Sequence, residues 1–295
     1  MAVVGFVGLG IMGSAMSRHV LERGFEVYGT DVAPERVAAF AAAGGRPADD
    51  VAAVAAAADV VITSLPSEDA ARQVFAALAD AARAGQVVVE TSTLSLEAKH
   101  ACRAALEPKG AVVLDCPLSG TGAQALERDV VVYGSGDPTA FERARPVLEG
   151  FSRSVRYLGA FGQGSTMKYV ANLLVAVHNA STAEAFALGV RAGLDPAQLY
   201  DTIRDGAGSS VIFEKRGRLM VDRAYVPATA KVSMFVKDVE LIRQLADSLG
   251  LATPMLDATD ALYARAVEQG LADADAAALL DVMGDPRADD DRGGS

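Results

Sequence analysis

The first half of the chain alternates short, nearly continuous apolar runs with segments of helical character. The runs, such as Val60-Val61-Ile62 and Val87-Val88-Val89, lack the polar–apolar alternation of a sheet with one wet face. Buried strands separated by helices predict a doubly wound α/β sheet, parallel at least at its start. The predicted strands are Val3–Val7, Glu26–Thr30, Asp59–Ser64, Gln86–Thr91, Ala111–Cys116, Val130–Tyr133 and Val155–Leu158, and the predicted helices include Pro34–Ala43, Glu68–Leu78, Leu96–Leu106 and Thr139–Leu148.

The pattern changes after Gly159, and every later segment is helical in character. Residues 164–192 form one long segment without proline, in which apolar side chains recur at helical spacing. Shorter helices are predicted at Pro196–Arg204, Val211–Met220, Ser233–Leu249, Pro254–Glu268 and Asp275–Val282. We therefore expect a dinucleotide-binding-type α/β domain over 1–160, a helical domain over 161–284 that begins with the long connecting helix, and a flexible tail over 285–295.

Composition fits this two-domain picture and narrows the function. With 295 residues, 51% hydrophobic and 22% charged, the chain is long enough for two folded domains. A net charge of −11 disfavours binding to nucleic acid or to an anionic membrane surface, which needs clustered basic residues. The start lacks the basic leader of a signal peptide, and no apolar run approaches the roughly 20 residues that span a bilayer. Cys102 and Cys116 give neither a disulfide framework nor metal-binding spacing, so we expect a cytoplasmic enzyme without a metal.

A glycine-rich loop, Gly8-Leu9-Gly10-Ile11-Met12-Gly13, follows the first predicted strand and opens a helix. Its glycines allow a tight turn and a close approach of the backbone to a pyrophosphate at the helix N-terminus. The motif alone is weak evidence, but the strand before it and the periodic helix after it supply the required context. An ordinary glycine-rich turn is the less favoured alternative.

The second predicted strand ends at Asp31, 18 positions after Gly13. An acidic residue about 20 positions beyond the loop binds the ribose hydroxyls of NAD and repels the 2′-phosphate of NADP. The nearest arginine, Arg36, is five residues further on. The pattern favours NAD over NADP, although Asp31 can also cap the next helix.

Several blocks carry a family resemblance. The start Gly5-Phe6-Val7-Gly8-Leu9-Gly10-Ile11-Met12-Gly13-Ser14-Ala15-Met16 resembles the signature of the β-hydroxyacid dehydrogenases, which include 3-hydroxyisobutyrate dehydrogenase, tartronate semialdehyde reductase and, more distantly, 6-phosphogluconate dehydrogenase. Five further blocks follow in the family's order, beginning with Leu65-Pro66 and Glu90-Thr91-Ser92-Thr93. The others are Asp115-Cys116-Pro117-Leu118-Ser119-Gly120, the segment from Gly162 to Asn172, and Phe235-Val236-Lys237-Asp238.

The resemblance implies a role for each block. Leu65, Pro66, Thr93 and Lys237 would contact the cofactor, and Lys168 would be the catalytic lysine with Asn172 as its partner. Ser119 and Gly120 would hold the substrate carboxylate. The helical domain would also form a homodimer or homotetramer.

The residues themselves are compatible with this chemistry. Hydride transfer requires one group that removes or returns the hydroxyl proton, and a lysine serves when its pKa is lowered. Lys168 lies in the first turns of the long helix, where the helix dipole disfavours a further positive charge, and Asn172 lies four residues on along the same face. The Ser119 hydroxyl and the backbone N–H groups of Gly120 and Thr121 would form a nest for a carboxylate.

The sequence therefore predicts an NAD-dependent oxidoreductase that interconverts a small β-hydroxy acid and its semialdehyde or keto acid. Thr121 stands where relatives have a second glycine, so its side chain could narrow the pocket or add a hydrogen bond. Two alternatives stay open: a reductase of another carbonyl or imine on the same scaffold, and a non-catalytic NAD-binding module.

Overall fold

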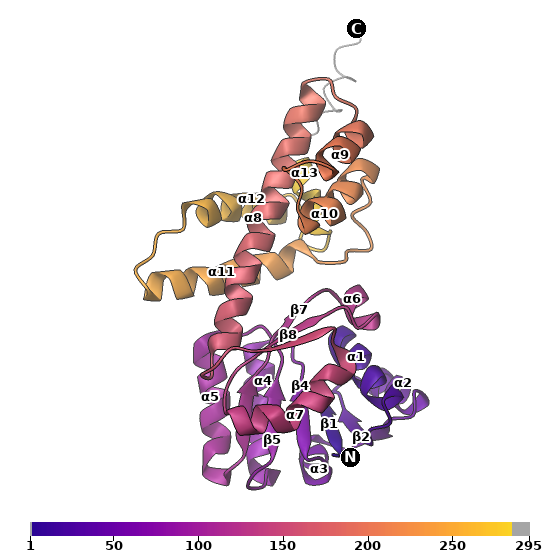
Figure 1. Cartoon of the computed structure of the whole chain (residues 1–295), viewed down its shortest axis with the longest axis vertical. Helices are drawn as coiled ribbons and strands as arrows, with labels where there is room; N and C mark the ends of the chain where they lie inside the picture. The colour runs from indigo at the N-terminus through magenta and orange to yellow at the C-terminus, as the bar shows by residue number, and fades with distance from the viewer. Residues whose placement is uncertain (1, 285–295) are drawn as a thin grey trace. The chain divides into compact units, whose positions relative to one another are not determined.

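The computed structural model describes residues 2–284, and the predicted tail at 285–295 lies outside them. The chain divides into two compact units, Met1–Lys168 and Tyr169–Ser295 (Figure 1). The boundary lies inside a long helix, α8 (Gln163–Arg191), eight residues after the expected end of the α/β domain. The predicted fold class, a Rossmann-type α/β domain followed by a long helix and a helical region, is confirmed.

Within the described residues, the first unit is built on a six-stranded sheet of order β3-β2-β1-β4-β5-β6, and all its neighbouring strands are parallel. The strands β1, β4 and β5 are buried along their whole length, as their continuous valine runs predict. The bounds are β1 Val4–Val7, β2 Val27–Thr30, β3 Arg46–Pro47, β4 Val60–Thr63, β5 Val87–Glu90 and β6 Val112–Asp115.

Helices cover both faces of this sheet, which makes the fold doubly wound (Figure 1). One core joins the sheet to α1, α2 and α7 through residues such as Met16, Phe40 and Phe141. The other core joins it to α3, α4 and α5 through residues such as Val54, Phe75 and Leu106. The bounds are α1 Ile11–Glu22, α2 Pro34–Ala42, α3 Val51–Ala57, α4 Glu68–Ala81, α5 Leu96–Leu106, the 3-10 turn η1 Glu107–Lys109, and α7 Pro138–Phe151.

A smaller sheet of order β7-β8-β9 follows the large one. It comprises β7 (Leu118–Ser119), β8 (Val131–Gly134) and β9 (Ser154–Tyr157), with β7 antiparallel and β9 parallel to β8. The short helix α6 (Gly122–Leu126) connects β7 to β8. A bridge between Asp115 and Ser135 joins the small sheet to the end of β6.

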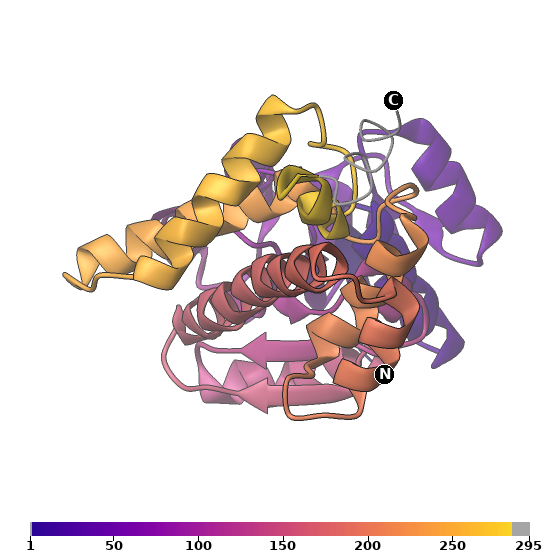
Figure 2. The same cartoon turned by 90° about the horizontal axis from the view of Figure 1, so that it is seen from above.

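The second unit is helical, as predicted. Its helices α11 and α12 run side by side as a hairpin (Figure 2). An 18-residue window of α8 is apolar enough to cross a membrane, but 44% of it is buried inside the protein, so we interpret α8 as a core helix. The remaining bounds are α9 Pro196–Arg204, α10 Val211–Asp222, α11 Val232–Ser248, α12 Pro254–Glu268, η2 Ala276–Ala278 and α13 Leu279–Val282.

Candidate functional site

The glycine loop has the tight geometry that a dinucleotide requires. Gly8 has a φ of +92°, and a Cβ there would collide with the carbonyl oxygen of Ser64. A Cβ on Gly13 would collide with the carbonyl oxygen of Gly8, so this glycine lets α1 start directly against the turn. At Gly10, by contrast, the nearest atom to a Cβ is the Arg36 guanidinium at 3.8 Å. The loop therefore leaves open space at Gly10, at the N-terminus of α1, where a dinucleotide pyrophosphate fits.

Asp31 lies just after β2 and is tied to this loop. Its Oδ2 accepts a hydrogen bond from the Leu9 N–H at 2.7 Å, and its Oδ1 accepts one from the Ala33 N–H at 2.9 Å. The Arg36 guanidinium lies 3.4 Å from both oxygens, because the first turn of α2 brings it back toward the strand end. Asp31 thus holds the loop and the start of α2 together, and Arg36 lies closer to the expected ribose position than its sequence distance suggests.

The expected nicotinamide segments follow β4 and β5 at the same edge of the sheet. The Leu65 N–H donates to the Ser92 hydroxyl at 2.8 Å, which connects the Leu65-Pro66 turn to the segment that carries Thr93. The Thr91 hydroxyl donates to the Thr63 carbonyl at 2.7 Å. Because β1, β4 and β5 are parallel neighbours, these turns lie beside the glycine loop.

The expected carboxylate-binding segment starts with Ser119, the last residue of β7. Gly120 adopts a φ of +143°, and Thr121 caps α6 in a capping box with Gln124. The Thr121 N–H donates to Gln124 Oε1 at 3.1 Å, and the Thr121 hydroxyl bonds the same oxygen at 3.3 Å. These polar groups of Thr121 are engaged within the protein. The prediction that the Thr121 N–H helps to bind a carboxylate therefore does not fit this structure, and Ser119 and Gly120 stay the predicted donors.

Lys168 lies in the second turn of α8 and is half-buried. The first turn is fixed at its start: the Thr166 hydroxyl donates to the Gly162 carbonyl at 2.9 Å, and the Ser165 N–H donates to Asp115 Oδ2 at 2.8 Å. Asn172, four residues further along the same helix, is 7% exposed. Helical spacing places both side chains on one face.

In the second unit, the Asn172 amide donates to Asp238 Oδ2 at 2.6 Å. Because a carboxylate only accepts hydrogen bonds, this contact determines which way the amide faces. Lys237 and Asp238 lie in α11, with Lys237 Nζ 3.5 Å from Asp238 Oδ1. Asn172 and Asp238 are 66 residues apart, and no pattern in the sequence indicates this bond.

Sequence reasoning also missed a buried ionic cluster beside these segments. Lys99 of α5 lies between Glu90 and Asp115, the last residues of β5 and β6, and all three side chains are 0% exposed. Burial alone would lower the pKa of Lys99, but the charges of Glu90 and Asp115 outweigh it and raise that pKa. Lys99 is therefore charged, and the two carboxylates share its ammonium group.

The described residues also contain side chains of the types that ligate metal ions, and two thiols. Within 2–284, no group of three or more histidine, cysteine or acidic side chains is arranged to hold a metal ion. Both cysteines are buried as free thiols, and burial raises the pKa of Cys102 to about 12 and that of Cys116 further. At neutral pH both side chains are therefore neutral.

Comparisons with known proteins agree with the fold and the motifs. Residues 3–159 match the family model described as the NAD binding domain of 6-phosphogluconate dehydrogenase. Residues 162–283 match the model described as NAD-binding of NADP-dependent 3-hydroxyisobutyrate dehydrogenase.

Individual relatives are similar over nearly the whole chain. An L-threonate dehydrogenase of Cupriavidus necator is 34% identical over 284 residues, covering 95% of each chain. A 3-hydroxyisobutyrate dehydrogenase structure from Salmonella typhimurium has a TM-score of 0.87 and 32% identity, covering 96% of this chain and 100% of that one. A 3-hydroxyisobutyrate dehydrogenase of Mycobacterium tuberculosis, described with L-serine, has a TM-score of 0.89 and 28% identity, covering 96% and 99%.

Proposed function

Because the chain belongs to the β-hydroxyacid dehydrogenase family, we propose that it interconverts a small β-hydroxy acid and its semialdehyde or keto acid, with NAD(H) as cofactor and Lys168 as general acid/base. One observation carries the proposal. Lys168 shares a helix face with Asn172, and the partly buried Asp238, whose side chain is 14% exposed, orients the Asn172 amide. A surface lysine with an incidental asparagine neighbour would not require such an arrangement.

In this proposal the chain's own residues manage the proton and the substrate's orientation. A bound nicotinamide ring supplies the hydride acceptor or donor. Lys168 removes the hydroxyl proton during oxidation and returns it during reduction, while the Asn172 amide holds the same hydroxyl beside it. The Ser119 hydroxyl and the Gly120 backbone bind the substrate carboxylate, which fixes the carbon to be oxidised relative to Lys168.

The residues around the ribose position favour NAD over NADP. Two backbone N–H groups hold the Asp31 carboxylate in place, where its charge would repel a 2′-phosphate. Arg36 is half-exposed beside it and would offset part of that repulsion. We therefore propose a preference for NAD and not an absolute requirement.

The relatives suggest the size of the substrate. L-Threonate, 3-hydroxyisobutyrate and L-serine, which appear in the relatives' descriptions, are three- to four-carbon-backbone acids with a hydroxyl group near the carboxylate. We propose a substrate of this class. The capped loop at Thr121 would limit the space beside the carboxylate.

We also propose a cytoplasmic homo-oligomer, a dimer or a tetramer. Large apolar side chains on the second unit are exposed, among them Leu188 at 72% and Val211 at 67%, and a subunit interface would cover such residues. The two other functions considered, a carbonyl or imine reductase and a non-catalytic NAD-binding module, are separated from the main proposal by the following experiment.

The test compares Lys168→Ala with Lys215→Ala, which changes an exposed lysine of α10. Wild type is assayed by NADH absorbance with 3-hydroxyisobutyrate, L-threonate, glycerate, L-serine, 3-hydroxypropionate and 4-hydroxybutyrate, and with the corresponding semialdehydes. We expect Lys168→Ala to lose about 10²–10⁴-fold in kcat and to bind NADH normally, since general acid–base catalysis contributes that much. Lys215→Ala should behave as wild type. No turnover of any of these acids or semialdehydes by wild type would refute the proposal.

A further inference from the structure

The buried cluster of Lys99, Glu90 and Asp115 has a role that stability does not explain. Taking three charged groups out of water is costly, and apolar side chains of similar size often make an equally stable core. The cluster lies where β5 and β6 end, with Lys99 Nζ in contact with Glu90 Oε2 and 3.1 Å from Asp115 Oδ1. Its function is indicated by the groups to which the two carboxylates bind.

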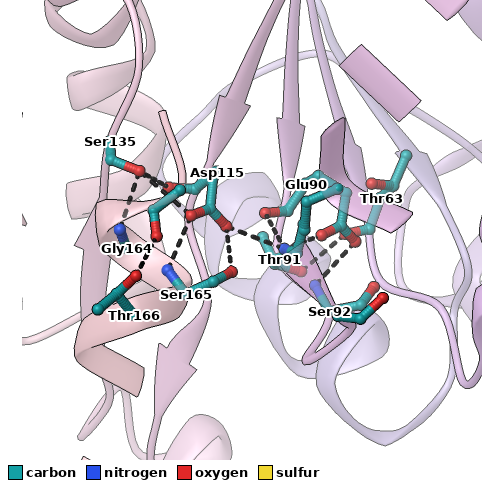
Figure 3. A network of polar contacts seen from close by, with 12 residues as sticks. Thr63, Glu90, Thr91, Ser92, Asp115, Ser135, Gly164, Ser165 and Thr166 are labelled. Atoms are coloured by element: carbon teal, nitrogen blue, oxygen red, sulfur yellow. Dashed lines mark hydrogen bonds and ion pairs between the residues drawn. The ribbon is translucent and has the colours of Figure 1, made fainter. Parts of the chain in front are cut away.

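Asp115 binds the start of α8 (Figure 3). Its Oδ2 accepts the Ser165 N–H at 2.8 Å, and its Oδ1 accepts the Ser165 hydroxyl at 2.7 Å. The Gly164 N–H donates to the Ser135 hydroxyl at 2.9 Å, and that hydroxyl is 3.2 Å from Asp115 Oδ2. First-turn N–H groups have no partner within a helix, so these contacts determine where α8 begins.

Space around this first turn is equally restricted. A Cβ on Gly164 would collide with the carbonyl oxygens of Tyr133 and Asp115. The start of α8 is therefore packed directly on the ends of β6 and β8. Lys168 lies one turn beyond Ser165 on the same helix, so the position of this first turn sets the position of Lys168.

Glu90 binds the other segment (Figure 3). Its Oε1 accepts the Ser92 N–H at 2.9 Å, and the Ser92 hydroxyl accepts the Leu65 N–H at 2.8 Å. These bonds hold the turn after β4 and the segment that leads into Thr93. One lysine thus joins two carboxylates, each of which fixes a different segment of the proposed site.

We propose that Lys99 is a positioning residue for hydride transfer: through Glu90 and Asp115 it fixes the Thr93 segment relative to the first turn of α8, and thereby to Lys168. This inference rests on the proposed function. Without the ammonium group, two neighbouring buried carboxylates would repel each other, and one would have to take up a proton or move away from its partners.

Three variants test the cluster. Ser135→Ala removes the acceptor of the Gly164 N–H, and Ser165→Ala removes one donor to Asp115. Lys99→Met combined with Glu90→Gln removes two opposite charges together, and the new amide oxygen can still accept the Ser92 N–H. The matched control is Ser152→Ala, which deletes a buried hydroxyl that donates to the Leu148 carbonyl at 2.7 Å, outside the cluster.

The readouts separate positioning from stability. We expect kcat to fall by about 10²-fold in the cluster variants, the cost of a misplaced catalytic group, while the Kd for NADH is unchanged. The primary deuterium isotope effect on kcat should rise, because hydride transfer becomes rate-limiting. Hydrogen exchange of the Gly164 and Ser165 amides should be faster in Ser135→Ala. Ser152→Ala should lower the melting temperature without any of these changes.

The inference is overturned if the cluster variants keep wild-type kcat. It is equally overturned if the cluster variants, like Ser152→Ala, change only the melting temperature. It is also overturned if the first turn of α8 exchanges at the wild-type rate in Ser135→Ala. Absence of wild-type turnover would instead refute the proposed function, and hydrogen exchange would then still decide whether the cluster anchors α8.

Discussion

The three glycines of the cofactor loop should respond in opposite ways to the addition of one methyl group. At Gly8 and Gly13 a Cβ would meet backbone oxygen atoms, whereas at Gly10 it would meet nothing closer than 3.8 Å. Gly10 also has ordinary dihedral angles, with φ −66° and ψ −165°, that alanine adopts without strain. Gly10→Ala therefore places a methyl group in space that the protein leaves open and that we assign to the pyrophosphate.

The expected magnitudes follow from this geometry. Replacing glycine by alanine at compatible angles stabilises a protein by about 0.4–1 kcal/mol, and the poorer N-cap character of alanine offsets this by a similar amount. The melting temperature should therefore stay near that of wild type. A methyl group that keeps the pyrophosphate from one backbone N–H removes a charge-assisted hydrogen bond of about 1.5–3 kcal/mol, which weakens NADH binding by about 10- to 150-fold.

The assay is a titration of NADH followed by its own fluorescence, since the chain has no tryptophan whose quenching could report binding. Gly150→Ala is the matched control, because Gly150 lies in α7, away from the glycine loop. A Cβ there would come no closer than 3.7 Å to an atom of another element. Gly13→Ala should instead destabilise the fold. Wild-type affinity of a folded Gly10→Ala variant, or its failure to fold, would refute the assignment.

Two further predictions concern charge. Asp31→Asn should raise the ratio of kcat/KM for NADP to that for NAD by at least about tenfold. The reason is that a carboxylate and a phosphate charge about 6 Å apart repel by about 3 kcal/mol at an effective dielectric constant of about 20. Adding Val32→Arg, at a fully exposed position, should increase the ratio further. A wild type that already prefers NADP in steady-state kinetics would contradict this interpretation. Second, burial raises the pKa of Cys102 from 9.0 to about 12, so the folded state keeps a proton that the unfolded state loses as the pH rises. The free energy of unfolding should therefore fall above pH 9, by about 1.4 kcal/mol per pH unit for each such thiol. Urea unfolding between pH 8 and 10 should show a shallower decline in Cys102→Ala, and equal slopes would contradict the prediction.

Most of the fold could be predicted because fully buried apolar strands and amphipathic helices leave strong patterns. The elements that were missed are short or lack a polar face. Two residues form β3 and two form β7, and α6 has only five, so none shows a period. The helix α3 is an alanine–valine run without polar residues, which gives no contrast between its faces.

The site divides in the same way. The residues of the glycine loop are neighbours in the sequence, so the spacing of its glycines is enough to predict the turn. The bond from Asn172 to Asp238 and the Lys99 cluster join distant segments, which one sequence does not reveal. One signal was nevertheless present: Lys99 shares a helix face with Cys102 and Leu106, so a lysine interrupts an otherwise apolar stripe. A charged residue in that setting indicates a buried ionic partner.

The position of α8 across two compact units bears on how such enzymes can diverge. Lys168 is the last residue of the first unit and Tyr169 the first of the second, with no break in the helix between them. The residues that hold the first turn of α8, and with it Lys168, are Asp115, Ser135 and Ser165. All three belong to the first unit. Recombination that exchanged the helical unit beyond this point would keep the proposed acid/base group together with the residues that position it. The residues after it, Asn172 included, would be free to change with a new substrate.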